Sequence, residues 1–379
     1  MFIPLFTASM SVVALYVYIR LILPLPLPVV VEIALGIGVV LLANRVLIMR
    51  LFHATASDAL LLVGSWLHAA VLMAALLCFV ADVGFLVFGD PGIPPVTFSG
   101  VVALGGLTLA AYGVRSALRV PPVREMTMTV PRLAPQLHGF RIAVLTDVHV
   151  GPLLRRRWVE KVVDRTLAAQ PDLIALPGDL VDSPETVLAK DIVPLGRLRA
   201  PYGVYYSPGN HEYIYGVEGW MRVFRRLGMK VLYNQHDVVD VGGATLTIAG
   251  LADQVGAIRP GATPDIDAAL AGAPERDDFR LLLAHRPYDA AIHAERGVDL
   301  HLAGHTHGGQ IWPLRPLTAS ANAGYAGGWY NVGRMRLFVS NGVGVWAGVP
   351  LRLGVPNHIA IVRLEPDGET DLAAAVSAA

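Results

Sequence analysis

Five short polar clusters in this sequence carry side chains of the types that bind metal ions. They are Asp147-Val148-His149, Gly178-Asp179-Leu180-Val181-Asp182, Gly209-Asn210-His211-Glu212, His285, and Gly304-His305-Thr306-His307. Together they supply imidazole nitrogens, carboxylates and one amide oxygen, a mixed donor set that suits first-row divalent cations. Each cluster follows a short apolar run of the kind that forms a buried β-strand. The donors suffice for a pair of ions, so the sequence predicts a two-metal site.

The spacing within the first two clusters indicates how a donor could reach an ion. Asp147 and His149 are two residues apart at a predicted strand end, so one tight turn can aim both at a single cation. Asp179 follows Gly178, whose missing side chain lets the backbone come close to the site. A carboxylate has two oxygens, so Asp179 can bridge two ions.

The other clusters complete the expected chemistry. Asn210 offers a neutral amide oxygen, and His305 and His307 can serve different ions because they are two residues apart. Two ions about 3.5–4 Å apart clamp the attacking and leaving oxygens of an in-line displacement, and a water that bridges them is acidic enough to be hydroxide near neutral pH. His211 is then free to give a proton to the leaving oxygen while Asp182 holds it.

No single cluster is specific. An Asp-x-His pair or a Gly-Asn-His-Glu tetrapeptide occurs by chance, and an isolated histidine is more often a core or surface residue than a ligand. The informative feature is the conjunction of five clusters, all of metal-ligand type, each after a predicted strand.

Composition divides the chain of 379 residues into an apolar first third and a part typical of soluble proteins. Hydrophobic residues make up 54% and charged residues 16%, and the mean hydropathy is +0.52, which is high for a soluble protein. The formal net charge is zero, so no bulk basic field indicates a nucleic-acid partner. The single cysteine, Cys78, excludes a framework of intrachain disulfides.

The apolar excess lies in four runs, at residues 1–23, 29–52, 59–88 and 96–118. Each reaches the roughly 20 residues needed to cross a bilayer core, so we expect a transmembrane region of about four helices. A cleaved signal peptide fits poorly, because the amino end lacks a basic segment and apolar runs continue far beyond it.

Basic residues set the expected orientation. Arg45 and Arg50 lie near the end of the second run, and Arg115, Arg119 and Arg124 lie at or after the end of the fourth. With an even number of crossings these two regions fall on one side, which the positive-inside rule makes cytoplasmic. We therefore expect an integral protein of the inner or plasma membrane with a cytoplasmic catalytic domain.

From residue 139 onward, apolar strand-like runs alternate with helix-like segments. Strands are expected at 140–145, 171–176, 203–207, 230–233, 245–249, 280–284 and 299–303. Helices are expected at 154–169 and 217–227, with a partly helical stretch at 187–198 that Pro194 interrupts. This alternation predicts a layered α/β domain.

The motifs resemble those of the calcineurin-like metallophosphoesterase superfamily, whose full set occurs here in order over roughly residues 137–364. Flanking segments at 139–142, 308–311 and 350–352 are similar to a membrane-associated bacterial branch, related to a phosphodiesterase group that includes lipid-headgroup pyrophosphatases. The resemblance implies an α/β fold, a sandwich of two β-sheets flanked by helices. The expected domains are a transmembrane helical region at 1–120, a linker at 121–138, the metallophosphoesterase domain at 139–366 and a tail at 367–379.

The resemblance also implies a role for each donor. One metal would be bound by Asp147, His149 and His307, the second by Asn210, His285 and His305, and Asp179 would bridge them. His211 would be the proton donor or transition-state stabiliser, with Asp182 as its partner. These donors suit manganese, iron or zinc, and affinity order alone does not choose among them.

The sequence therefore predicts a membrane-anchored dinuclear-metal phosphoesterase that cleaves a phosphodiester or pyrophosphate bond, with lipids and nucleotide-lipids as candidate substrates. Membrane lipids are expected around it, and no nucleic acid. One alternative is a non-catalytic scaffold on the same fold, although such relatives typically lose ligands and this chain keeps them. A second alternative is a transporter or sensor, for which the apolar runs show no obvious paired charges.

Overall fold

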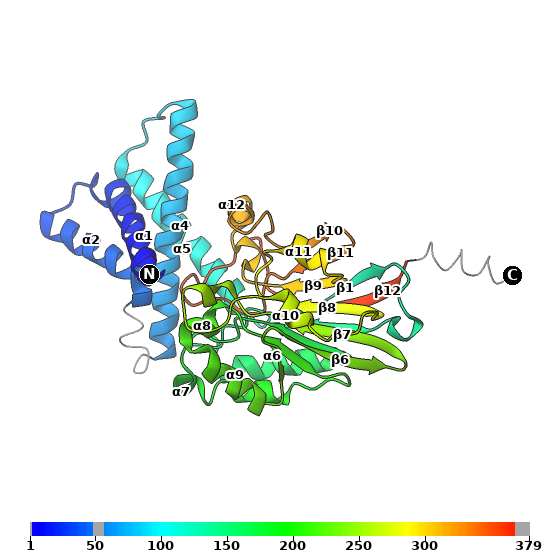
Figure 1. Cartoon of the computed structure of the whole chain (residues 1–379). Coiled ribbons are helices and arrows are strands. Elements are labelled where there is room, and N and C mark those ends of the chain that lie inside the picture. The colour runs from blue at the N-terminus through cyan, green and yellow to red at the C-terminus, as the bar shows by residue number, and fades with distance from the viewer. Residues whose placement is uncertain (1, 48–56, 368–379) are drawn as a thin grey trace. The chain divides into compact units, whose positions relative to one another are not determined.

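The computed structural model describes residues 2–47 and 57–367 of the chain (Figure 1). These residues form two compact units. The first contains the described residues up to Arg119 together with Trp346–Leu353, and the second contains Val120–Val345 together with the described residues from Gly354 onward. No pattern in the sequence indicates that Trp346–Leu353 belongs with the helices. The domain boundaries expected from the sequence stay a prediction.

The first unit is helical. Its elements are α1 (Phe2–Val17), a π-helical turn η1 (Tyr18–Ile22), α2 (Val29–Ala43), α4 (Asp58–Phe88) and α5 (Pro95–Leu118). Three segments are long and apolar enough to cross a membrane, namely Leu5–Ile22, α4 and α5. Helix α2 is apolar but only 15 residues long, about 22 Å at the helical rise. Part of the run predicted to continue it to residue 52 lies outside the described residues, so a fourth span stays a prediction.

A charge pair joins two elements of this unit, although the sequence showed no obvious paired charges there. Arg20 in η1 donates from Nε to Asp82 Oδ2 at 3.1 Å and from Nη2 to Oδ1 at 2.5 Å, and the Tyr16 hydroxyl donates to the same carboxylate at 2.6 Å. Paired charges inside apolar helices are candidate functional groups. This pair is about one-third exposed and ties the end of α1 to the end of α4.

The segment Trp346–Leu353 is held to the helices through its backbone. His68 Nε2 on α4 lies 3.0 Å from the Gly348 carbonyl oxygen, and the Arg352 amide donates to the Gly113 carbonyl on α5 at 3.1 Å. His68 is fully buried, so these contacts form part of the packing of the unit.

The second unit contains two six-stranded mixed sheets. In sheet order, the first consists of β1 (Val123–Val130), β12 (Ile359–Pro366), β2 (Arg141–Val144), β3 (Leu173–Pro177), β4 (Val204–Ser207) and β5 (Lys230–Val231). The second consists of β10 (Gly328–Val332), β11 (Met335–Val339), β9 (Leu300–Ala303), β8 (Phe279–Leu283), β7 (Ala244–Gly250) and β6 (Gln235–Val241). Strands β2 to β5 run parallel to one another, as do β7, β8, β9 and β11.

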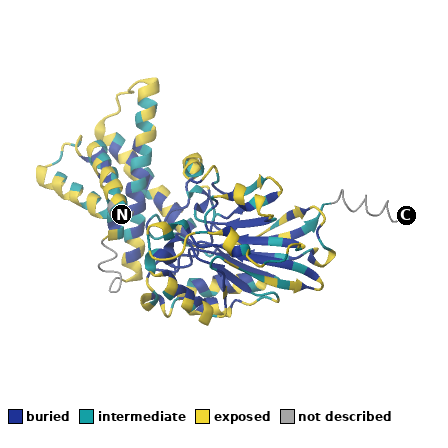
Figure 2. Ribbon diagram, viewed as in Figure 1, coloured by how far each residue is buried: buried dark blue, intermediate teal, exposed yellow. Residues whose placement is uncertain are grey.

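Alternating side chains place the sheets face to face. On β2, Ile142 and Val144 belong to the core shared by the two sheets, whereas Ala143 belongs to the core beneath the helices of the first sheet. Those helices are α6 (Arg156–Ala168), α8 (Asn210–Tyr215) and α9 (Val217–Arg226), while α10 (Ile266–Leu270) and α11 (Ala290–Glu295) pack on the second sheet. Figure 2 shows the strands as the most continuously buried part of the unit. The predicted sandwich flanked by helices is confirmed.

The structure differs from the sequence expectation mainly at the sheet margins. Strand β1 lies in the segment expected to be a linker and pairs in parallel with β12. Its alternation of half-buried Met126 and buried Met128 and Val130 with exposed polar residues fits a strand with one buried face. The stretch at 187–198 is broken as expected, into α7 (Glu185–Leu188) and the 3₁₀ turn η3 (Val193–Arg197).

Candidate metal centre

The predicted donors all lie on loops that follow parallel strands. Asp147 and His149 come after β2, Asp179 after β3, Asn210 after β4, His285 after β8, and His305 and His307 after β9. Open α/β sheets place their sites at the carboxyl ends of parallel strands. The sandwich therefore brings together residues that are up to 160 positions apart, and nearly all of them are buried.

Five of these donors have left-handed backbone conformations. The φ angles are 53° at Asp147, 51° at His149, 55° at Asp179, 69° at His305 and 50° at His307. Positive φ is uncommon outside glycine, and several such residues at one place cost free energy that a structural role alone does not require. The loops are thus bent to aim these side chains at a common point.

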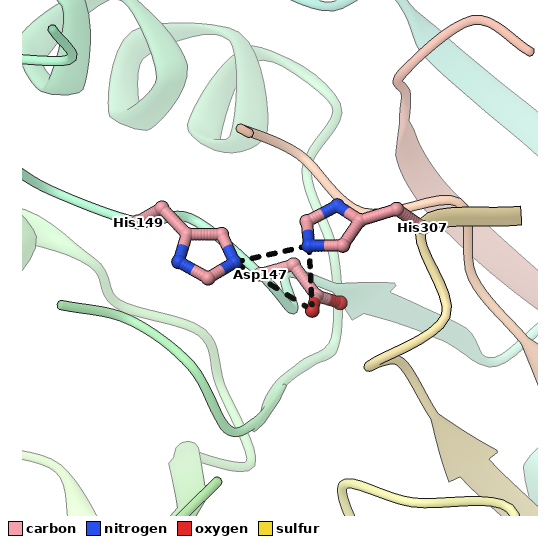
Figure 3. Close-up of side chains that lie close together, drawn as sticks. All are labelled: Asp147, His149 and His307. Carbon is pink, nitrogen blue, oxygen red and sulfur yellow. Dashed lines mark hydrogen bonds and ion pairs between the residues drawn. The ribbon is translucent and has the colours of Figure 1, made fainter. Parts of the chain in front are cut away.

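The first donor group consists of Asp147, His149 and His307. Nε2 of His149 lies 3.1 Å from Nε2 of His307, and Oδ1 of Asp147 lies 3.5 Å from the His307 nitrogen and 3.9 Å from the His149 nitrogen. Figure 3 shows the three side chains pointing at one another from separate segments. Two ring nitrogens and a carboxylate oxygen thus converge on one small volume.

The second group consists of Asp179, His285 and His305, and Asn210 directly precedes His211, whose backbone N–H donates to Asp179 Oδ1 at 2.8 Å. Nε2 of His285 lies 3.1 Å from Oδ2 of Asp179, and the rings of His285 and His305 meet edge to face at 5.3 Å. The Oδ1 atom of Asn210 is buried and has no hydrogen-bond partner within the described residues. A buried acceptor without a donor is costly, and a cation would satisfy it.

Hydrogen bonds fix which ring nitrogen faces each group. The Nδ1–H of His285 donates to the Pro177 carbonyl at 2.9 Å. Nδ1 of His149 lies 2.7 Å from Asp182 Oδ1 and donates to it, because an ionised carboxylate only accepts. In the neutral form of both rings, Nε2 carries the lone pair and faces the other donors, an arrangement typical of metal-binding histidines.

His211 stands between the carboxylates without being part of either donor group. Its Nδ1 donates to Asp182 Oδ1 at 2.7 Å, so Asp182 holds both His211 and His149. Burial disfavours the imidazolium form, but the charges of Asp179 and Asp182 outweigh it and raise the pKa of His211 to about 9. Burial likewise opposes ionisation of Asp182, yet the two histidines lower the pKa of that carboxyl to about 2.

The donor set fits divalent cations. The atoms of Asp147, His149 and His307 lie within 4.8 Å of one another, as do those of Asp179, His285 and His305. The charge of the carboxylates also favours a bound cation. Burial lowers the pKa of His285, but the charge of Asp179 outweighs burial and raises that pKa to about 10. Of the seven predicted metal donors, the structure gathers six into these two groups, and Asn210 is not in either of them. Their roles as ligands stay a prediction.

Two glycines permit the close approach of the loops. Gly178 has φ +81°, and a Cβ there would lie 2.6 Å from the Gly209 nitrogen and 2.8 Å from the His285 ring. A Cβ at Gly209 would in turn lie 2.6 Å from the Asp179 backbone nitrogen. No side chain fits between these segments, so the expected role of Gly178 has a clear steric basis.

Glu212 organises the site, and the sequence reading assigned it no role. Its buried carboxylate accepts backbone N–H groups from Asp179 at 3.0 Å, Leu180 at 2.7 Å and Gly209 at 2.7 Å. One side chain thus joins the loop after β3 to the loop after β4. The one signal available in the sequence was a carboxylate next to the Gly-Asn-His motif at a helix start.

We expect Glu212→Ala to lower the free energy of unfolding by about 3 kcal/mol or more, because it leaves three buried N–H groups without acceptors. The measurement is a thermal melt of the purified full chain in detergent. Glu218→Ala, which removes an exposed glutamate from the neighbouring helix α9, serves as the matched control and should melt within a degree or two of the wild type. Equal midpoints for the two variants would contradict this role of Glu212.

Metal removal should make stability depend on pH. The folded-state pKa values of His211 and His285, about 9 and about 10, exceed the ordinary value of about 6.5. Such groups stabilise the fold fully below pH 6.5, and the contribution is lost as pH rises through 9 and 10. The melting temperature of the chelator-treated chain should therefore fall from pH 7 to pH 10. Added manganese or zinc should weaken the trend, because a cation would replace the proton on His285 and offset the charge of Asp179 beside His211. A flat profile for the stripped chain would refute this account of the charges.

The chain is similar to a known protein family and to several known proteins. Residues 140–309 match the family described as calcineurin-like phosphoesterase. An "uncharacterized metallophosphoesterase" of Helicobacter pylori J99 is 34% identical over 269 residues, which cover 69% of this chain and 70% of the relative. A Danio rerio "transmembrane protein with metallophosphoesterase domain" is 32% identical over 265 residues, covering 68% of this chain and 60% of the relative.

Among solved structures, a putative 5'-nucleotidase from Staphylococcus aureus aligns with a TM-score of 0.39 and 15% identity. The alignment covers 60% of this chain and 55% of that structure.

Proposed function

Because the chain belongs to the calcineurin-like metallophosphoesterase family, we propose that it is a membrane-anchored phosphoesterase that uses two divalent metal ions to hydrolyse a phosphodiester or pyrophosphate bond. The observation that carries the proposal is the pair of buried donor groups, in the second of which Asp179 Oδ2 lies 3.1 Å from His285 Nε2. The ions expected are manganese, iron or zinc. The scaffold alternative expects lost ligands, and this chain retains the complete set.

The residues of the chain divide the catalytic work. When bound, divalent cations would supply positive charge to the phosphoryl oxygens and lower the pKa of a water molecule. The charge of Asp182 raises the pKa of His211 and so favours its imidazolium form, which can give a proton to the leaving oxygen. Asp182 Oδ1 accepts a hydrogen bond from Nδ1 of His211 at 2.7 Å. This bond fixes the imidazole ring and directs its Nε2 away from Asp182.

The helical unit favours the proposal that the substrate resides in the bilayer. Three described segments are long and apolar enough to cross a membrane, and relatives are described as transmembrane proteins. A phosphoesterase anchored in this way meets lipids and lipid-linked nucleotides at high local concentration. The arginines Arg45, Arg115 and Arg119 favour a cytoplasmic catalytic domain in the inner or plasma membrane.

The test is a substrate panel with the purified full chain. A generic phosphodiester, a generic monoester and a nucleotide-diphosphate lipid are each incubated with manganese, with zinc or with chelator, and phosphate ester cleavage is measured. Metal-dependent cleavage that favours the lipid pyrophosphate supports the whole proposal. Cleavage of the diester without preference for lipid refutes the lipid substrate and retains the phosphoesterase. No cleavage by a chain shown to hold metal would favour the scaffold.

A further inference from the structure

A cavity lies on the helical unit between the first turns of α4 and the last turns of α5. Its volume is about 760 Å³, within the range of sites that bind small molecules. Most of its lining is apolar, and at the carboxyl end of α5 it includes two arginines; the residues that matter here are Leu62, Val63, Trp66, Tyr112, Arg115 and Arg119. The cavity is therefore amphipathic along its length.

A tryptophan held by a hydrogen bond forms one wall of the apolar part of the cavity. Trp66 donates its indole N–H to the Leu107 carbonyl of α5 at 2.9 Å, which fixes the ring between the two helices. Leu62 and Val63, one turn earlier on α4, are each 47% exposed. In water these side chains would be an unfavourable surface, whereas an acyl chain lying against them would cover them.

The charged part has a geometry that suits a phosphate. Arg115 lies in the last turn of α5 and Arg119 is the residue that caps it; both line the cavity and both are exposed. Guanidinium groups bind phosphate oxygens through paired N–H donors. Basic cavities between transmembrane helices on the cytoplasmic side bind anionic lipid headgroups. Arg119 also directly precedes the segment that enters β1 at Val123, so the cavity lies at the end of the helix that leads into the catalytic unit.

We propose that this cavity binds one anionic glycerophospholipid of the phosphatidylglycerol type, with an acyl chain against Trp66 and Leu62 and its phosphate on Arg115 and Arg119. The lipid is a bound ligand of the helical unit and not the hydrolysed substrate, so the inference does not depend on the metal centre. A phosphatidylcholine headgroup fits less well, because its ammonium group would face two positive charges. A soluble phosphate would leave the apolar wall uncovered.

The experiment uses tryptophan fluorescence of the full chain in phosphatidylcholine nanodiscs. Brominated lipids quench nearby indoles, and subtracting the signal of a Trp66→Phe variant isolates the contribution of Trp66. Brominated phosphatidylglycerol at a low mole fraction should quench Trp66 as if it were enriched roughly 25-fold, about a factor of five for each arginine. Brominated phosphatidylcholine should quench only in proportion to its mole fraction.

Variants that remove arginines test whether the two positive charges cause the enrichment. The double variant R115Q/R119Q should lose the enrichment, whereas R225Q/R226Q, which removes two exposed arginines from α9, should keep it. Enrichment that survives in R115Q/R119Q, or that is equal for both lipids, overturns the proposal. Displacement of the lipid by millimolar soluble glycerol phosphate would also overturn it, because the apolar wall would then contribute nothing.

Discussion

Replacing Asp179 with asparagine should lower the rate of hydrolysis of a generic phosphodiester by roughly 1,000-fold, the scale on which enzymes lose rate when a preorganised charge-stabilising group is removed. The reason is the position of its carboxylate. Oδ2 lies 3.1 Å from Nε2 of His285, while Oδ1 accepts the backbone N–H of His211 at 2.8 Å. Asparagine keeps the shape of the side chain, but it removes the charge through which Asp179 is proposed to bridge the two metal ions.

The control for Asp179→Asn is Asp164→Asn, which neutralises an exposed carboxylate that pairs with Arg197 on the surface. Its activity should stay within about twofold of the wild type, because exposed ion pairs contribute little. Metal content measured on the same samples should fall in Asp179→Asn and not in Asp164→Asn. Full diesterase activity in Asp179→Asn would rule out the bridging role.

His211→Gln should lower kcat by about 100- to 10,000-fold for a substrate with an alkoxide leaving group, the range expected for a lost general acid. The loss should be much smaller for a p-nitrophenyl ester, because nitrophenolate leaves without a proton. The dependence on the leaving group separates proton donation from a merely structural role. Bound metal should remain unchanged, since His211 is outside both donor groups.

His138→Gln is the matched control, because it replaces an exposed histidine that belongs to neither donor group, and it should leave both rates unchanged. An equal loss for the two substrates in His211→Gln would argue that the residue positions the site and does not transfer a proton. Loss of metal in the same variant would make His211 a ligand and refute its assigned role.

The interior strands and the donor groups could be predicted because local patterns determine them. Apolar runs such as that ending at Leu145 and that ending at Leu176 are continuous because parallel strands in the middle of a sandwich are buried on both faces. The polar residues that interrupt each run, Asp147 and Asp179, therefore mark the strand ends. The order of five such clusters carried the resemblance to the family, and the resemblance implies which donors bind each metal.

Features that depend on distant partners could not be predicted. Strand β1 has one buried face, and its partner β12 lies more than 200 residues later, so its alternation alone was too weak to identify it. The second contact of Asp182, with His149, and the three backbone bonds of Glu212 need the folded loops in place. The association of Trp346–Leu353 with α4 and α5 depends on backbone carbonyls, which leave no mark on the sequence.

The central claim is that activity requires two metal ions held by the residues around Asp147 and Asp179. The most direct measurement is a titration of the chelator-treated full chain with manganese or zinc, in which bound metal and diester hydrolysis are followed on the same sample. We predict no hydrolysis before metal is added and full hydrolysis as the second equivalent binds. Hydrolysis that persists in the stripped chain, or that saturates with one equivalent, would contradict the two-metal account.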